Sequence, residues 1–156
     1  MREWRMRDSE CLGRVFTCGR PGRGTEGYQR KYRRVDDDTI NRWIAGLPQT
    51  DIVHIVSLLG RKTNGCSEFI YYPFRSVTER GTDPTFQEWL DDRYPLRFVV
   101  REFPTVDARG IETDVLESVK QCVLGLLAAN QTVVILDSAG AQPVTTTPMD
   151  VVIACA

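Results

Sequence analysis

The residues best suited to do chemistry are an aspartate and a run of small residues. They come directly after a stretch that has the pattern of a buried strand. Residues 133–136 form a continuous apolar run, which is typical of a strand covered on both faces. Asp137 comes next, followed by Ser138, Ala139, Gly140, Ala141 and Gln142. Small residues let successive backbone N–H groups converge on an anion, usually where a helix begins. The pattern predicts an anion-binding loop with the negative charge of Asp137 at its base.

Three other sets of polar residues also have structural interpretations. Asp36, Asp37 and Asp38 could ligate a metal ion, but they precede an amphipathic pattern, which favours a role at a helix N-terminus. His54 lies in an apolar run and is expected to be a hydrogen-bonded packing residue. Cys66 has no neighbouring histidine or arginine to activate a thiolate. We therefore expect neither a metal ligand nor a nucleophile among them.

The run from Leu136 to Pro143 resembles the signature loop of the protein tyrosine and dual-specificity phosphatases. That loop reads His-Cys-x-x-Gly-x-x-Arg, and the Ser-Ala-Gly core of residues 138–140 matches it. Leu136 stands where the family has histidine, and Asp137 stands in place of the nucleophilic cysteine. Pro143 replaces the arginine that grips phosphate. The resemblance implies the family's α/β fold without its catalytic pair.

Two upstream segments extend this resemblance. Residues 103–107, Phe-Pro-Thr-Val-Asp, resemble the segment that carries the family's general-acid aspartate, so the resemblance implies that role for Asp107. Asp107 has an alternative role as the cap of a turn before the next helix, which we slightly prefer. Residues 51–58 are similar to a buried strand of these enzymes. Together the matching segments cover about residues 35–156 in the family's order.

The resemblance leads to a functional hypothesis of binding without cysteine-based phosphatase activity. Asp137 offers no thiolate, and Pro143 removes both a guanidinium and a backbone donor. We expect a phosphatase-like protein that binds a protein partner or a phosphorylated ligand and needs no cofactor. The alternative is an active phosphatase, or another hydrolase that uses Asp107 and Asp137. An aspartyl-phosphate at Asp137 is disfavoured, because Mg²⁺ needs further carboxylates and the next acidic residue is Asp150.

Composition indicates a single domain, with a basic segment at its start. The chain has 156 residues, 42% of them hydrophobic, and a net charge of -1. Residues 1–34 hold 10 basic and 4 acidic residues, a net +6, so the remainder carries −7. We expect residues 1–34 to be partly flexible and residues 35–156 to form the domain. Nucleic-acid binding by the basic segment is a weaker hypothesis, because few aromatic residues accompany its charges.

Cysteine usage and hydropathy indicate the compartment. Five cysteines with no Cys-x-x-Cys pair disfavour a disulfide framework and a zinc site. No apolar run reaches the ~20 residues of a membrane span, and the first residues lack a signal peptide's apolar core. We expect a cytoplasmic protein without a membrane segment.

The elements that position these residues follow from hydrophobic periodicity. Strands are predicted over residues 14–18, 52–58, 68–74, 97–103 and 133–136. Helices are predicted after residue 38, over residues 84–92 and 112–129, and after Thr147 and Pro148. Glycines and arginines at residues 19–24 indicate a flexible loop, because no strand–loop–helix context supports a phosphate loop. The expected architecture is a central, mostly parallel sheet of about four or five strands flanked by helices.

Overall fold

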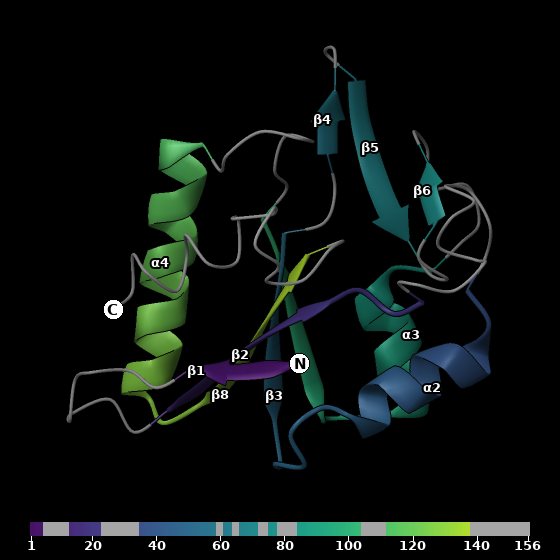
Figure 1. Cartoon of the computed structure of the whole chain (residues 1–156), viewed down its shortest axis with the longest axis horizontal. Coiled ribbons are helices and arrows are strands. Elements are labelled where there is room, and N and C mark those ends of the chain that lie inside the picture. Colours follow the sequence, from purple (N-terminus) through teal and green to yellow (C-terminus); the bar gives the residue numbers. More distant parts are fainter. Residues whose placement is uncertain are drawn as a thin grey trace.

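The computed structural model describes residues 1–4, 13–22, 35–58, 61–63, 66–71, 75–77, 84–103 and 112–137. It shows an α/β fold built on a five-stranded, mostly parallel sheet with helices on both faces, as predicted (Figure 1). The strands of this sheet are β1 (Arg2–Trp4), β2 (Arg14–Gly19), β3 (Val53–Ser57), β7 (Phe98–Glu102) and β8 (Thr132–Asp137).

The sheet has the order β1-β2-β8-β3-β7, which places β8 at its centre. Strands β2, β3 and β7 all run parallel to β8, whereas β1 is antiparallel to β2. Strand β8, the last one among the described residues, is thus inserted between β2 and β3, which come much earlier in the chain. All six residues of β8 are buried, which explains the continuous apolar run and confirms a strand covered on both faces.

Helix α2 (Asp37–Ala45) begins at the three aspartates, and their capping role is confirmed. The carboxylate of Asp36 accepts a 2.7 Å hydrogen bond from the backbone N–H of Thr39, which lowers the pKa of that carboxyl. Asp37 and Asp38 lie in the first turn, where the helix dipole favours negative charge. Ile40 and Ile44 form the buried face of the helix.

Helix α3 (Phe86–Arg93) begins with a capping box in which Thr85 and Glu88 exchange hydrogen bonds. Phe86, Trp89 and Leu90 are buried, as the spacing predicted. The side-chain amide of Gln87 reaches the edge strand β7, accepting from Val100 N at 2.6 Å and donating to the Phe98 carbonyl at 3.0 Å. This amide replaces a neighbouring strand over part of the edge.

Helix α4 (Thr113–Ala128) covers the other face of the sheet, so the molecule has three layers (Figure 1). Its buried residues Val119, Val123 and Leu127 pack on the face of the sheet that carries Val133 and Ile135. A second apolar cluster joins the opposite face to α2 and α3. Because side chains alternate along β8, this one strand contributes to both clusters.

A separate three-stranded antiparallel sheet contains β4 (Arg61–Thr63), β5 (Cys66–Tyr71) and β6 (Arg75–Val77). Cys66 begins β5, so the strand predicted over residues 68–74 starts two residues earlier and ends at Tyr71. The helix expected after Thr147 and Pro148 lies outside the described residues. In the part of the chain that the structure describes, no helix has the length and hydropathy to cross a membrane.

Candidate functional site

Four parallel strands bring their carboxyl ends to one edge of the sheet, and this edge is the candidate site. Gly19 of β2 is in register with Asp137, and Ser57 of β3 is in register with both Leu136 and Glu102. The connection from β3 to β7 contains α3, whereas the connection from β7 to β8 contains α4 on the opposite face. Ligands of open α/β sheets bind beyond the carboxyl ends of strands where successive connections change face. The topology therefore supports a site at this edge.

Backbone hydrogen bonds fix the end of β8 to both neighbouring strands. The carbonyl of Asp137 accepts from Arg20 N at 2.8 Å, and the carbonyl of Leu136 accepts from Leu58 N at 2.8 Å. Asp137 is only 8% exposed, so its side chain is held in the protein rather than in bulk water. Asp137 shares the face of Val133 and Ile135 and is therefore directed toward the α4 layer.

The negative charge of Asp137 acts on Cys18 of β2. Burial is the main cause that raises the pKa of the Cys18 thiol to about 12, and Asp137 adds to this rise, while the terminal amino group acts in the opposite direction. Cys18 therefore stays a neutral thiol at physiological pH. A neutral, buried thiol is neither a nucleophile nor a metal ligand.

Arg20 and Glu102 also lie at this edge, and the sequence analysis did not single out either residue. Arg20 is only 9% exposed. It comes directly after Gly19, the residue of β2 that is in register with Asp137 at the end of β8. Glu102 ends β7 with an exposed side chain, and partial desolvation raises the pKa of its carboxyl. The sequence signal that could have identified Arg20 and Glu102 was their position at the end of predicted strands, because residues that end parallel strands meet at one edge of a sheet.

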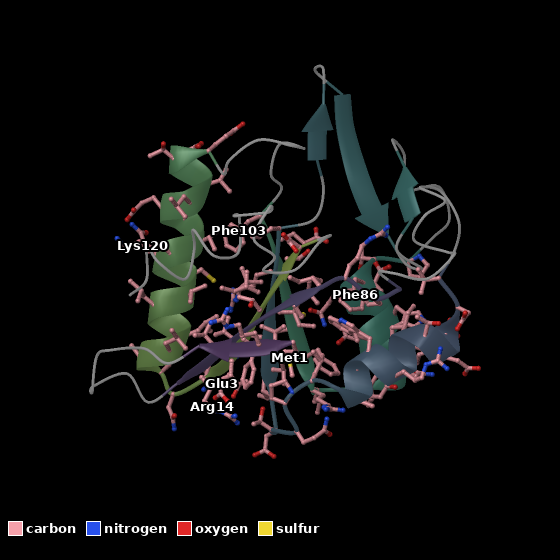
Figure 2. All side chains as sticks on the ribbon, viewed as in Figure 1. Met1, Glu3, Arg14, Phe86, Phe103 and Lys120 are labelled. Carbon is pink, nitrogen blue, oxygen red and sulfur yellow. The ribbon has the colours of Figure 1, made fainter. Side chains whose placement is uncertain are left out.

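Glu102 and Asp137 do not form a carboxylate pair. Glu102 shares the face of Phe98 and Val100, which pack toward α2 and α3, whereas Asp137 faces the α4 layer. Phe103, which follows Glu102, packs on the α4 side (Figure 2). Among the described residues of this edge, the carboxylates of Glu102 and Asp137 thus lie on opposite faces of the sheet and do not form one acid–base pair.

The start of the predicted loop at residues 19–24 is packed against the domain. Arg20, Pro21 and Gly22 are buried, and Gly22 adopts φ 78°, where a Cβ would lie 2.8 Å from Val35 Cγ2. The indole N–H of Trp43 donates to the Gly19 carbonyl at 3.0 Å and ties α2 to the end of β2. Residues 20–22 are therefore buried against the domain rather than exposed in a loop.

Most of the predicted anion loop lies outside the described residues. This applies to Ser138, Ala139, Gly140, Ala141 and Gln142, and also to Asp107 and Pro143. The convergence of the loop amides and the proximity of Asp107 to Asp137 remain predictions. The side chain of Cys66 is also outside the described set.

His54 lies far from this edge, near the amino end of β3, and its packing role is confirmed. It is 9% exposed, and its Nε2 lies 3.1 Å from the side-chain oxygen of Gln131. An amide oxygen only accepts, so Nε2 carries the proton in this pair. His54 stabilises the connection between α4 and β8.

Comparisons with family models, curated proteins and solved structures gave no match to this chain. The central feature of the candidate site is Asp137, a buried carboxylate at the end of the central strand.

Proposed function

We propose that this protein is an inactive counterpart of the tyrosine and dual-specificity phosphatases and acts by binding a protein partner or a phosphorylated ligand. The supporting observation is the position of Asp137, which ends the buried central strand and leads into the small-residue loop. In the resembling family this position holds the nucleophilic cysteine. The proposed location is the cytoplasm, because the cysteine pattern suits a reducing compartment.

The chemistry of Asp137 favours binding over turnover. A carboxylate lacks the sulfur nucleophile of the family's reaction, and Cys18 at the neighbouring strand end is held as a thiol. A phosphate ~4 Å from the Asp137 charge would be repelled by about 4 kcal/mol at an effective dielectric of ~20. This corresponds to about a thousandfold loss of phosphate affinity. A ligand must therefore gain its affinity from contacts beyond the phosphate, as a protein partner does.

The first experiment restores the two family residues. Asp137→Cys combined with Pro143→Arg would recreate the signature pair, and we expect this double variant to hydrolyse an aryl phosphate while the parent shows no turnover. Asp137→Cys alone is the matched control, because it supplies the thiol without the guanidinium. A folded double variant, checked by circular dichroism, that neither hydrolyses nor binds aryl phosphate would refute the phosphatase resemblance.

The same assay tests the alternative of a hydrolase that uses Asp107 and Asp137. If the parent chain has turnover that disappears in Asp107→Asn or in Asp137→Asn, the binding-only proposal is wrong. If the parent is inactive, Asp137→Asn should instead increase phosphate affinity, by up to about a thousandfold, because it removes the repelling charge. Isothermal titration with inorganic phosphate measures that gain.

A further inference from the structure

A pocket of about 470 Å³ lies at the edge of the sheet opposite the candidate site. Its walls come from three segments, residues 13–14, 50–52 and 130–132. These segments lead into β2, β3 and β8, so the pocket opens at the amino ends of parallel strands whose carboxyl ends form the other site. Its volume falls in the range of small-molecule sites, ~300–1,000 Å³.

The wall formed by Gln131 is held rigidly. Its backbone N–H donates to the Leu126 carbonyl at 2.9 Å, and its own carbonyl accepts from Arg14 N at 3.2 Å. Its side chain contacts His54 at 3.1 Å and donates to the Ala129 carbonyl at 3.1 Å. The pocket wall is thus formed in the free protein, which reduces the entropic cost of binding.

Two residues of opposite charge, Arg14 and Asp51, line different sides of this pocket. Arg14, Thr132 and Val53 are neighbours in register, so the backbones of Arg14 and Val53 lie about 10 Å apart at the usual strand spacing. Asp51 precedes Val53 by two residues and lines the pocket together with Arg14. Among the described residues, Asp51 makes no ion pair or side-chain hydrogen bond. Its carboxylate is available to a ligand.

Glu3 of β1 orients the guanidinium of Arg14. Arg14 Nε donates to Glu3 Oε1 at 2.7 Å, and Figure 2 shows the two side chains next to each other. Within the described part of the chain, no other hydrogen bond involves the Arg14 side chain, so its two terminal nitrogens remain available as donors. The guanidinium also stacks on the ring of Phe16, 4.9 Å from its centre, and its terminal nitrogens form a fork suited to a carboxylate.

The end of α4 lies on the Arg14 side of the pocket. Gly13 N donates to the Leu127 carbonyl and Arg14 N to the Gln131 carbonyl, each at 3.2 Å, so the backbone of β2 occupies these two carbonyls. The charged groups that line the pocket are therefore the side chains of Arg14 and Asp51. The carboxylate of Asp51 suits an ammonium group, whereas the guanidinium of Arg14 suits a carboxylate.

We propose that this pocket binds a small zwitterion of the amino-acid or short-peptide class. The ligand's carboxylate pairs with the terminal nitrogens of Arg14, and its ammonium pairs with the carboxylate of Asp51. A molecule with both charges satisfies both sides of the pocket, whereas a simple acid or amine satisfies one. The proposal concerns a separate edge of the sheet and does not depend on the proposed function.

The test uses the full chain and a series of ω-amino acids of increasing length: glycine, 4-aminobutyrate and 6-aminohexanoate. Butyrate and butylamine are the single-charge controls. We expect the best zwitterion to bind with a Kd of about 1 mM and at least tenfold more tightly than either control, measured by titration of amide chemical shifts. The preferred length reports the separation of the two charges, and a peptide ligand is indicated if diglycine exceeds every member of the series.

Variants locate the site. Arg14→Gln and Asp51→Asn should each weaken zwitterion binding by about tenfold or more, because each removes a charge-assisted contact. Arg42→Gln on α2 and Glu117→Gln on α4 are matched controls that change one exposed charge elsewhere. The proposal is overturned if no zwitterion binds at about 10 mM, if butyrate or butylamine binds equally well, or if the two pocket variants bind like the parent.

Discussion

At the scale of single residues, burial decides which groups can react. Asp137 and Cys18 lie at the ends of adjacent strands, and the negative charge of the first reinforces the effect of burial on the second. Cys122 on α4 is half-buried, and burial raises the pKa of its thiol as well. Neither of these two cysteines is therefore poised as a thiolate.

The raised pKa of Cys18 predicts a specific dependence of stability on pH. Between about 9, the value of an unperturbed thiol, and about 12, the unfolded chain loses this proton while the folded chain keeps it. The contribution of Cys18 is therefore complete below pH 9 and falls by about 1.4 kcal/mol per pH unit above it. Urea denaturation of the parent and of Cys18→Ala across this range measures it. A stability difference that does not change with pH would contradict the buried thiol.

At the scale of elements, close backbone contacts fix where α4 meets the sheet. A Cβ at Gly13 would lie 2.7 Å from both Leu127 Cα and the Gln131 carbonyl oxygen, so the chain enters β2 directly against the end of α4. Gly13 N also donates to the Leu127 carbonyl at 3.2 Å. By contrast, a Cβ at Gly125, within α4, would meet nothing within 4 Å. Close packing thus requires a glycine at position 13, whereas no close contact among the described residues requires one at position 125.

Alanine substitutions at these glycines should change stability in opposite directions. We expect Gly13→Ala to destabilise the protein by about 1–3 kcal/mol, because backbone atoms of two elements must move. Gly125→Ala should stabilise it by about 0.5–1 kcal/mol, because alanine suits a helix interior better than glycine. Thermal and urea denaturation of both variants give the comparison. A stable Gly13→Ala protein would show that α4 and β2 do not meet this closely.

At the scale of the whole molecule, the central strand makes the two apolar layers one structural unit. Val133 and Ile135 of β8 belong to the α4 cluster, and Val134 and Leu136 belong to the cluster under α2 and α3. Residues 14–19 form an interior strand, so this part of the basic N-terminal segment belongs to the domain. The prediction of flexibility remains for residues 5–12 and 23–34, which lie outside the described residues.

This shared strand predicts a single cooperative unfolding transition. Leu127→Ala in the α4 cluster and Leu90→Ala in the α2 and α3 cluster should each destabilise the protein by about 2–5 kcal/mol. In each variant, circular dichroism and tryptophan fluorescence should report the same midpoint, although two of the three tryptophans, Trp43 and Trp89, pack on the α2 and α3 side of the sheet. Separate midpoints in the Leu127→Ala variant would show that the layers unfold independently.

The sequence by itself determined the fold class and most of the elements, but not the short strands β1, β4 and β6. Apolar periodicity located β8, α3 and α4 to within a few residues, and the aspartates before α2 indicated its start correctly. These signals are local, because a strand or helix buries one face or both according to its own spacing of apolar residues. The sequence also placed Asp137 directly after a strand, which is the basis of the proposed site.

Only the tertiary structure decided which strand ends meet. The order of the sheet puts β8 between β2 and β3, and this brings Arg20 and Asp137 together although 116 positions separate them in the numbering of the chain. It also separates Glu102 from Asp137 onto opposite faces and creates the pocket between Arg14 and Asp51. Strand order depends on pairing between distant segments, and local spacing carries no information about that pairing.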